Sequence, residues 1–279
     1  MRDLKSALHY RGVASDLLAA VHPGPDKEID LFEVALQLAR IDDPELDVEH
    51  YRSVFARLVT DAKLYIGEQG KTDAVKKLRD FLFKENGFHG SRNEYYHHAN
   101  SYINHVLDDR EGLPITLSVL FIEMAHRLGI ENVFGVALPG RFLVGYRGHV
   151  EGELLLLNVF ENGTEMTRRD AETLAMQFGS RTDDTTFEPS PPRAIATRML
   201  RNLIGLEINQ KQNPPGALTY LNLLIEIEPE AVEARFQRAL VQAQTADFEG
   251  AKEDLDWLLE NRPEGINYRR LLQFREALP

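Results

Sequence analysis

The sequence contains no cysteine among its 279 residues. Such a chain forms no disulfide framework and no cysteine-based metal site, and it cannot perform thiolate catalysis with its own side chains. The absence also fits a reducing compartment, so we expect the protein in the cytoplasm.

Long apolar runs and basic patches are missing as well. The first 21 residues carry charges at Arg2, Asp3, Lys5, Arg11 and Asp16, and so lack the uninterrupted apolar core of a signal peptide. No later segment approaches the length of a membrane span. With 44 acidic against 32 basic residues, the formal charge is −12, which repels phosphate backbones and anionic lipids. We therefore expect a soluble protein that binds neither nucleic acid nor membranes.

The centre of the chain predicts a buried helix. Pro114 follows Gly112 and suits the first turn of a helix, where its missing amide hydrogen costs nothing. The segment 115–122 is apolar on nearly every face, which is typical of a helix buried all round. Gly129 stands where a left-handed C-cap residue is expected, so the helix should end near Leu128.

Strands follow this helix. Residues 133–136 and 142–146 have the composition of two short strands joined by a turn at Pro139 and Gly140. Residues 153–160 predict a third strand, and the sheet is expected to end at the loop 161–163. A buried helix leading into a small antiparallel sheet indicates the α+β class.

The remaining N-terminal residues predict helices. Apolar residues recur at helical spacing in residues 1–21, 31–39 and 47–59, and Asp47 is placed to cap the third of these helices. Thr72 could cap a fourth helix that ends at Gly87. We therefore expect a helical N-terminal part in front of the sheet.

Several short stretches of the sequence resemble a known protein family. The stretches NSYINHVLDDREGLPITLS, RLGI and PGRFLV resemble the bacterial SirB-type family, and the likeness covers roughly residues 40–165. That family combines a transglutaminase-like core, of the papain-like superfamily, with C-terminal tetratricopeptide repeats. The resemblance implies a catalytic Cys, His and Asp on the central helix and the two following strands.

This chain departs from all three implied catalytic positions. Pro114 stands at the position of the cysteine, Arg141 at that of the histidine, and Asn158 at that of the aspartate. Arginine stays protonated at ordinary pH and cannot act as a general base. We therefore expect no transglutaminase or cysteine-protease activity.

Arg141 is open to two interpretations. As a structural residue, its guanidinium would bridge backbone carbonyls at the turn of Pro139 and Gly140 or pair with a carboxylate. The candidate carboxylates are Asp108, Asp109 and Glu111. As a binding residue in an open cleft, Arg141 beside Asn158 would hold a carboxylate or a backbone amide without cleaving it.

Asn100 and Ser101 belong to the signature of the resembling family and are further candidates for binding. The simpler interpretation is that they cap a short helix that contains Val106 and Leu107. His89, His97 and His98 invite a metal site, but no pair of them lies on a clear helical face. We expect neither a metal nor another cofactor.

The C-terminal residues repeat with a period of 34, which resembles tetratricopeptide repeats. The matching pairs are Gly205 and Ala239, Ala217 and Ala251, Leu221 and Leu255, Leu224 and Leu258, and Pro229 and Pro263. We expect two repeats, which begin at about Arg198 and Val232, and a capping helix at 266–278. Residues 179–192 have the composition of a linker, so we place a transglutaminase-like domain at 1–180 and a repeat module at 193–279.

Three classes of function follow from these patterns. The first is a catalytically inactive domain that binds a protein or peptide. The second is a thiol-independent hydrolase or acyltransferase that uses Thr116 or Ser118, although such hydroxyls more often bond to the preceding helical turn. The third is a purely structural scaffold whose ancestral cleft is filled.

Overall fold

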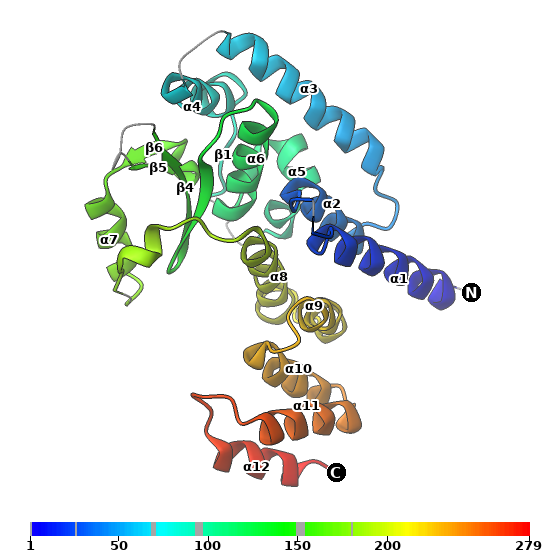
Figure 1. Cartoon of the computed structure of the whole chain (residues 1–279). Coiled ribbons are helices and arrows are strands. Elements are labelled where there is room, and N and C mark those ends of the chain that lie inside the picture. Colours follow the sequence, from blue (N-terminus) through cyan, green and yellow to red (C-terminus); the bar gives the residue numbers. More distant parts are fainter. Residues whose placement is uncertain (1, 26, 68–70, 93–96, 149–153, 180) are drawn as a thin grey trace. The chain divides into compact units, whose positions relative to one another are not determined.

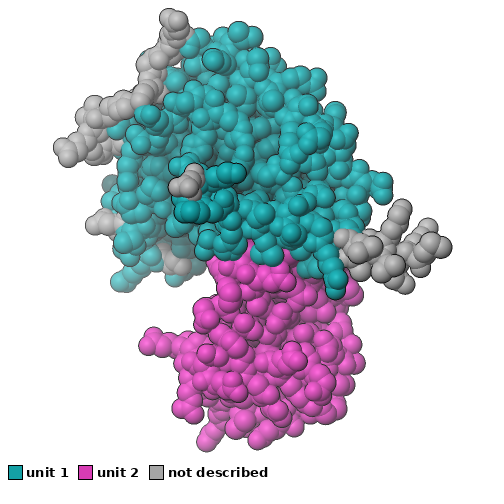
Figure 2. Space-filling model, turned by 45° about the vertical axis from the view of Figure 1, so that its right-hand side comes forward, with its two compact units in different colours: residues 1–199 teal, residues 200–279 magenta. Residues whose placement is uncertain are grey.

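Figure 1 shows the computed structural model, which describes residues 2–25, 27–67, 71–92, 97–148, 154–179 and 181–279. The chain divides into two compact units, residues 1–199 and 200–279, which Figure 2 colours separately. Strands occur in the first unit, and the described residues of the second form only helices and their connections. The predicted α+β class is confirmed. The division falls inside helix α8 (Pro192–Asn209), while the domain limits 1–180 and 193–279 stay a prediction.

The N-terminal part is helical, as predicted, but Thr72 does not cap the fourth helix, because it lies inside that helix. The helices are α1 (Arg2–Val21), α2 (Leu31–Asp42), α3 (Val48–Ile66) and α4 (Lys71–Asp80). Asp47 accepts a hydrogen bond from the backbone N of His50 at 3.0 Å, which confirms its predicted capping role. Phe32 of α2 stacks on Phe55 of α3 with ring centroids 3.9 Å apart, so these two helices share one apolar core.

The fourth helix does not run unchanged to Gly87 as the sequence predicts. It turns into a π-helix, η1 (Phe81–Glu85), whose wider turn buries the three consecutive side chains of Phe81, Leu82 and Phe83. Both the backbone N and the side-chain Nδ2 of Asn86 donate to the carbonyl of Phe81, at 3.0 and 2.9 Å. These two bonds close the π-helical turn, which apolar spacing alone does not predict.

The central helix is confirmed. Helix α6 (Pro114–Arg127) has Pro114 at its first position, and residues 114–125 are all buried. Gly129 adopts φ of +71° directly after the C-cap Leu128, as expected of a glycine that ends a helix.

The main sheet has four antiparallel strands in sequence order: β3 (Val133–Leu138), β4 (Arg141–Arg147), β5 (Leu154–Asn158) and β6 (Thr164–Met166). A Cβ on Gly140, at φ of +69°, would lie 2.4 Å from Phe178, so the predicted turn requires glycine. The prediction that the sheet ends at 161–163 is wrong, because β6 follows. Two of the three residues of β6 are exposed, so this strand has no clear apolar alternation to reveal it.

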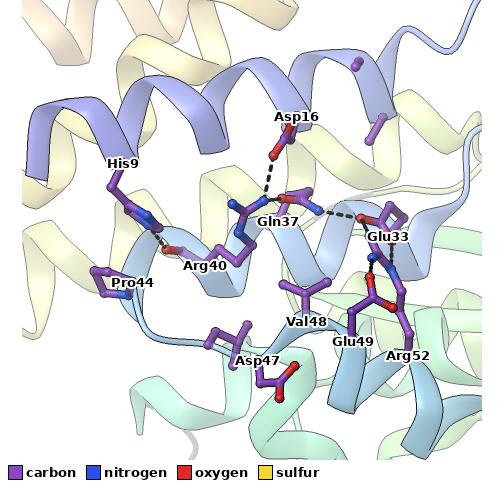
Figure 3. Close-up of a pocket in the computed structure, with 13 residues that line it drawn as sticks. His9, Asp16, Glu33, Gln37, Arg40, Pro44, Asp47, Val48, Glu49 and Arg52 are labelled. Atoms are coloured by element: carbon purple, nitrogen blue, oxygen red, sulfur yellow. Dashed lines mark hydrogen bonds and ion pairs between the residues drawn. The ribbon is translucent and has the colours of Figure 1, made fainter. Parts of the chain in front are cut away.

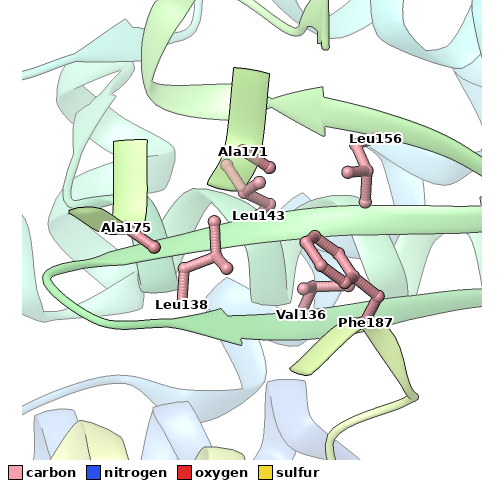
Figure 4. Close-up of a cluster of buried hydrophobic side chains, with 7 residues drawn as sticks. All are labelled: Val136, Leu138, Leu143, Leu156, Ala171, Ala175 and Phe187. Carbon is pink, nitrogen blue, oxygen red and sulfur yellow. The ribbon is translucent and has the colours of Figure 1, made fainter. Parts of the chain in front are cut away.

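One face of the sheet packs against helix α7 (Arg168–Met176). Figure 4 shows this cluster, which contains Val136, Leu138, Leu143, Leu156, Ala171, Ala175 and Phe187. Phe187 belongs to η4 (Asp184–Phe187), inside the stretch predicted as a linker, and the backbone N of Ser190 donates to Gly135 O at 2.9 Å. This stretch is therefore packed against the sheet, although its composition is that of a linker.

Short elements connect these parts. They are β1 (His89–Gly90), η2 (His98–Ser101), α5 (Ile103–Asp109), β2 (Glu111–Gly112) and η3 (Val159–Glu161). Strands β1 and β2 pair in parallel, with Gly90 opposite Gly112.

The second unit follows the period of 34. It contains the end of α8, α9 (Pro214–Ile227), α10 (Val232–Gln244), α11 (Phe248–Asn261) and α12 (Tyr268–Ala277). The matched residues Ala217 and Ala251 are both fully buried where helices meet. Gly216 and Gly250 are a further pair at the same offset, since a Cβ on either would lie under 2.5 Å from a neighbouring side chain. None of the described helices of the chain is long and apolar enough to span a membrane.

Candidate functional site

The hydroxyl groups near the start of α6 form hydrogen bonds with the backbone, so they are not free to react. The Oγ1 atom of Thr116 accepts from the backbone N of Leu113 at 2.9 Å and donates to the carbonyl of Asn100 at 2.9 Å. Ser118 Oγ donates to the carbonyl of Pro114 at 2.7 Å. Both side chains are at most 1% exposed. Each hydroxyl therefore serves the backbone of its own helix start, as serine and threonine inside helices commonly do.

Asn100 and Ser101 do not cap α5, so the simpler sequence interpretation is wrong. Both residues lie in η2, and the N-cap of α5 is Tyr102, which makes no side-chain capping bond. The extended backbone of Tyr102, at φ of −113° and ψ of 129°, separates the two helices and takes the cap position itself. Asn100 is buried, and its carbonyl accepts from Leu113 N as well as from Thr116. Its backbone therefore fixes the entry to α6.

Arg141 and Asn158 lie on one face of the sheet. Arg141 pairs with Leu138, and opposite residues of an antiparallel pair share a face. Asn158 lies two residues after Leu156 on β5, so it shares the face of Leu156. Leu138 and Leu156 both belong to the cluster packed against α7 (Figure 4). The structure thus brings to a common face the two positions that the sequence resemblance predicts for the histidine and the aspartate.

The Arg141 guanidinium lies near two aromatic rings. Its Cζ atom is 5.5 Å from the ring centroid of Phe178 and 5.9 Å from that of Phe160. Within the described parts of the chain it makes no ion pair or side-chain hydrogen bond. The carbonyls of Leu138 and Arg141 are instead bridged by Arg198 Nη2, at 3.2 and 2.9 Å. The predicted structural bridge exists, but a different arginine provides it.

Within the described residues, none of the carboxylates predicted as partners of Arg141 bonds to its side chain. Asp108 accepts from the hydroxyl of Tyr51 at 2.7 Å. Burial, followed by this bond to Asp108, raises the pKa of Tyr51 to about 12. Asp108 therefore helps to join α3 to α5 and does not neutralise Arg141.

Phe160 connects Arg141 with the start of α6. Besides its contact with Arg141, its ring approaches β1 so closely that a Cβ on Gly90 would lie 2.4 Å from Phe160 Cδ2. Gly90 pairs with Gly112, two residues before Pro114. Phe160 therefore lies close both to Arg141 and to the strand pair that precedes α6.

Two buried polar atoms at this junction have no hydrogen-bond partner among the described residues. They are Asn158 Oδ1 and Ser91 Oγ. Ser91 is fully buried, and its backbone N donates to Gly112 O at 3.1 Å, beside the helix start. A buried polar atom without a partner is costly in a folded protein, so the burial of each of these two atoms is unfavourable. No spacing pattern in the sequence points to Ser91, Phe160 or Phe178, because their neighbours come from distant segments.

The histidines form a chain of ring contacts. The centroids of His97 and His98 are 4.7 Å apart, and those of His98 and His105 are 6.4 Å apart. In the described residues, no group of three histidine, cysteine, aspartate or glutamate side chains is arranged to hold a metal ion.

The cavity in Figure 3 lies elsewhere, among α1, α2 and α3, and has a volume of about 740 Å³. Its charged groups bind one another. Arg40 bonds to Asp16 at 2.7 Å and to Gln37 at 2.5 Å, and Arg52 bonds to Glu33 at 2.6 Å. Because these groups are already paired, the cavity offers no evident chemistry for a ligand.

Comparisons with known proteins agree with this two-part organisation. The chain matches the transglutaminase-like superfamily over residues 49–201 and a tetratricopeptide repeat family over residues 208–276. A UPF0162 protein of Xylella fastidiosa is 32% identical over 255 residues, which cover 87% of each protein. F-box only protein 21 of Homo sapiens is 28% identical over 142 residues, which cover 49% of this chain and 22% of that protein.

A crystal structure of menin shows a weaker likeness, with a TM-score of 0.45 and 10% sequence identity over 88% of this chain and 68% of that one. This value is too low to inform the fold. The superfamily match covers more than half of the chain, and the Xylella relative is similar over nearly its whole length. The chain therefore belongs to the transglutaminase-like superfamily and, within it, to the UPF0162 proteins.

Proposed function

We propose that the first unit is a catalytically inactive transglutaminase-like domain that binds a carboxylate group of a protein or peptide at Arg141. The observation that carries the proposal is the position of the Arg141 guanidinium, near two phenyl rings and without an ion pair among the described residues. Aromatic faces favour a nearby cation and leave its N–H groups free to bond in the plane of the guanidinium.

Asn158 supplies the second part of the proposed site. Asn158 follows Leu157, which pairs with Val144 of β4, and lies on the same face of the sheet as Arg141. A planar guanidinium binds a carboxylate through two bonds, and we propose that a peptide N–H reaches the buried, unpaired Oδ1 atom of Asn158. Together they suit a peptide end or an acidic side chain next to its own backbone amide.

Thiol-independent catalysis is not favoured. Thr116 and Ser118 are buried, and their hydroxyls bond to backbone carbonyls. Arg141 offers neither hydroxyl a general base.

The partner is proposed to be a protein, because tetratricopeptide repeats generally mediate protein interactions and the second unit matches them. Within the UPF0162 group, the resemblance of residues 40–165 supports a SirB-type bacterial protein. Its site of action is proposed to be the cytoplasm, in keeping with the absence of cysteine.

The proposal is tested with fluorescent ten-residue peptide mixtures that carry either a free or an amidated C-terminus, titrated against the full chain by anisotropy. We expect tighter binding of free acids and at least a tenfold loss in Arg141→Gln, since one charged bidentate contact is lost. Arg57→Gln, on an exposed position of α3, is the control for net charge. Arg141→Gln should melt within about 2 °C of the wild type, because its side chain is not part of the apolar core.

Two outcomes contradict the proposal. One is a strongly lowered melting temperature of Arg141→Gln with unchanged peptide binding, which would make Arg141 structural. The other is equal binding of acid and amide peptides, or none of either. In parallel, purified protein should show no amine incorporation or peptide hydrolysis. The triple variant Pro114→Cys, Arg141→His, Asn158→Asp should gain little, because restoring three side chains does not restore the geometry that supports them.

A further inference from the structure

Phe178, two residues after the end of α7, is the most exposed phenylalanine among the described residues, with 48% of its surface accessible. Its backbone N donates to Ala175 O at 3.0 Å, and Gly179 N donates to Met176 O at 3.0 Å. Ala175 is fully buried against the sheet. The backbone therefore holds an apolar ring at the surface, although covering that ring would be favourable.

Part of the Phe178 ring is covered by the turn between β3 and β4. A Cβ on Gly140 would lie 2.4 Å from Phe178 Cδ1, so ring and turn are in direct contact. The Arg141 guanidinium lies beside the same ring, with Cζ 5.5 Å from its centroid. Arg198 bonds to the carbonyls of Leu138 and Arg141 and so holds this turn in place. An exposed apolar ring and a cation are thus presented next to each other.

The charges around this pair restrict what can bind. Arg141 makes no ion pair within the part of the chain that the structure describes, so it can bind a carboxylate. The chain as a whole has a formal charge of −12, which repels a partner with several acidic residues. A ligand with one carboxylate next to an uncharged apolar group satisfies both conditions.

The distances favour a peptide end over an acidic side chain. Hydrogen bonds of about 2.8 Å place the carbon of a bound carboxylate roughly 4 Å from Arg141 Cζ. The Phe178 centroid lies 5.5 Å from the same atom. In the last residue of a peptide, the side chain is attached to the carbon next to the carboxylate, so it comes within reach of the ring. An aspartate or glutamate side chain has only methylene groups there.

We propose that the site at Arg141 selects the free C-terminus of a partner protein whose last residue has a large apolar side chain, phenylalanine above all, which packs on Phe178. This inference rests on the proposed function and adds the class of peptide that the site takes. A phenyl ring covers exposed ring surface and pairs favourably at centroid distances of about 4.5–7 Å. Glycine offers no such surface, and aspartate adds a second negative charge that the chain repels.

The test uses the full chain and fluorescent ten-residue peptides that differ only in their last residue, which is phenylalanine, glycine or aspartate. Each is made as free acid and as amide. Anisotropy titrations should show at least tenfold tighter binding of the phenylalanine acid than of the glycine acid, and no gain for the aspartate acid. Phe178→Ser should remove most of this preference and leave the binding of the glycine acid unchanged. Leu64→Ser is the matched control, since Leu64 is 78% exposed on α3, and it should preserve the preference.

Two further variants separate direct contact with the peptide from support of Arg141. Phe178→Leu keeps an apolar side chain beside Gly140, so part of the preference for phenylalanine over glycine should remain. Arg141→Gln should weaken the binding of both free acids, because both use the carboxylate contact. Circular dichroism of every variant confirms that it remains folded.

The outcomes distinguish this inference from the proposed function. Equal binding of the phenylalanine and glycine acids, lost for both in Arg141→Gln, would overturn the inference and leave the proposed function standing. Equal binding of acids and amides, or no binding of any peptide, would refute both. The inference also fails if the preference survives in Phe178→Ser, if that variant loses both acids equally, or if the aspartate acid binds most tightly.

Discussion

Glu123 is the most informative residue for a stability measurement, because a buried carboxylate joins two helices there. It is 2% exposed on α6, and it accepts hydrogen bonds from Leu31 N at 2.9 Å and from Arg127 Nη1 at 2.5 Å. Arg127 also bonds to Asp30 at 2.5 Å and lies 4.8 Å from the ring centroid of Phe55. Glu123 thus ties the end of α6 to the first amide of α2.

Removing the carboxylate should be costly. Glu123→Ala leaves the amide of Leu31 without its acceptor, whereas Arg127, which is 32% exposed, keeps its bond to Asp30. Losing a buried hydrogen bond to a charged group costs about 1.5–3 kcal/mol. For a unit of this size, such a loss corresponds to a fall in melting temperature on the order of 10 °C. Glu123→Gln keeps an oxygen for Leu31 N and should lose only about 1–2 kcal/mol.

The contribution of Glu123 to the free energy of unfolding should change with pH in one direction. Burial, with a smaller contribution from the charge of Asp30, raises the pKa of Glu123 above its ordinary value of 4.5, while the bonds from Leu31 and Arg127 oppose the shift. The folded state therefore binds the proton more tightly than the unfolded state. The contribution of Glu123 to the free energy of unfolding is greatest below pH 4.5, falls as pH rises to the folded-state pKa, and is constant above it.

Urea denaturation of the wild type and of Glu123→Gln between pH 4 and 8 measures how the contribution of Glu123 to stability changes with pH. The advantage of the wild type over Glu123→Gln should shrink as pH rises through this window, because glutamine does not titrate. An advantage that grows with pH would mean that the ion pair with Arg127 dominates over burial, and would refute the reasoning. A loss below about 1 kcal/mol in Glu123→Ala would show that the bond to Leu31 N contributes little.

Three further substitutions test buried polar groups in the two units. Asp254 is 1% exposed and accepts bonds from Arg235 and Arg238, so Asp254→Ala should destabilise the second unit by about 3–5 kcal/mol in urea denaturation; a loss under 1 kcal/mol would contradict this. Thr116→Val keeps its shape but removes the bonds to Leu113 N and Asn100 O, and should cost about 1–2 kcal/mol. Ser118→Ala removes a hydroxyl whose acceptor keeps its helical bond, and should cost less; the reverse order in thermal melts would contradict the assigned bonds.

Elements governed by local rules were predictable from the sequence. Pro114 marked the start of α6, Gly129 its end and Asp47 the start of α3, because caps and backbone restrictions act within a few residues. The period of 34 predicted the repeat helices for the same reason, since each repeat contacts mainly its neighbours.

Elements that depend on distant contacts were missed or misplaced. Strand β6 has only three residues and little apolar pattern, and it forms because β5 offers an open edge. Phe187 lies in a stretch with linker composition, yet it is buried because the sheet face beside α7 is apolar. Asn100 and Ser101 were expected to cap α5, but the extended backbone of Tyr102 took that position.

For the candidate site, the sequence by itself determined what is chemically excluded: without cysteine, and with Arg141 in place of a base, no thiol triad can form. That conclusion depends only on which side chains exist. The tertiary structure alone decided what surrounds Arg141, because Phe160, Phe178 and Arg198 come from separate segments. It likewise decided that Phe178 stays 48% exposed beside Arg141, since the identity of a residue does not show whether packing covers it.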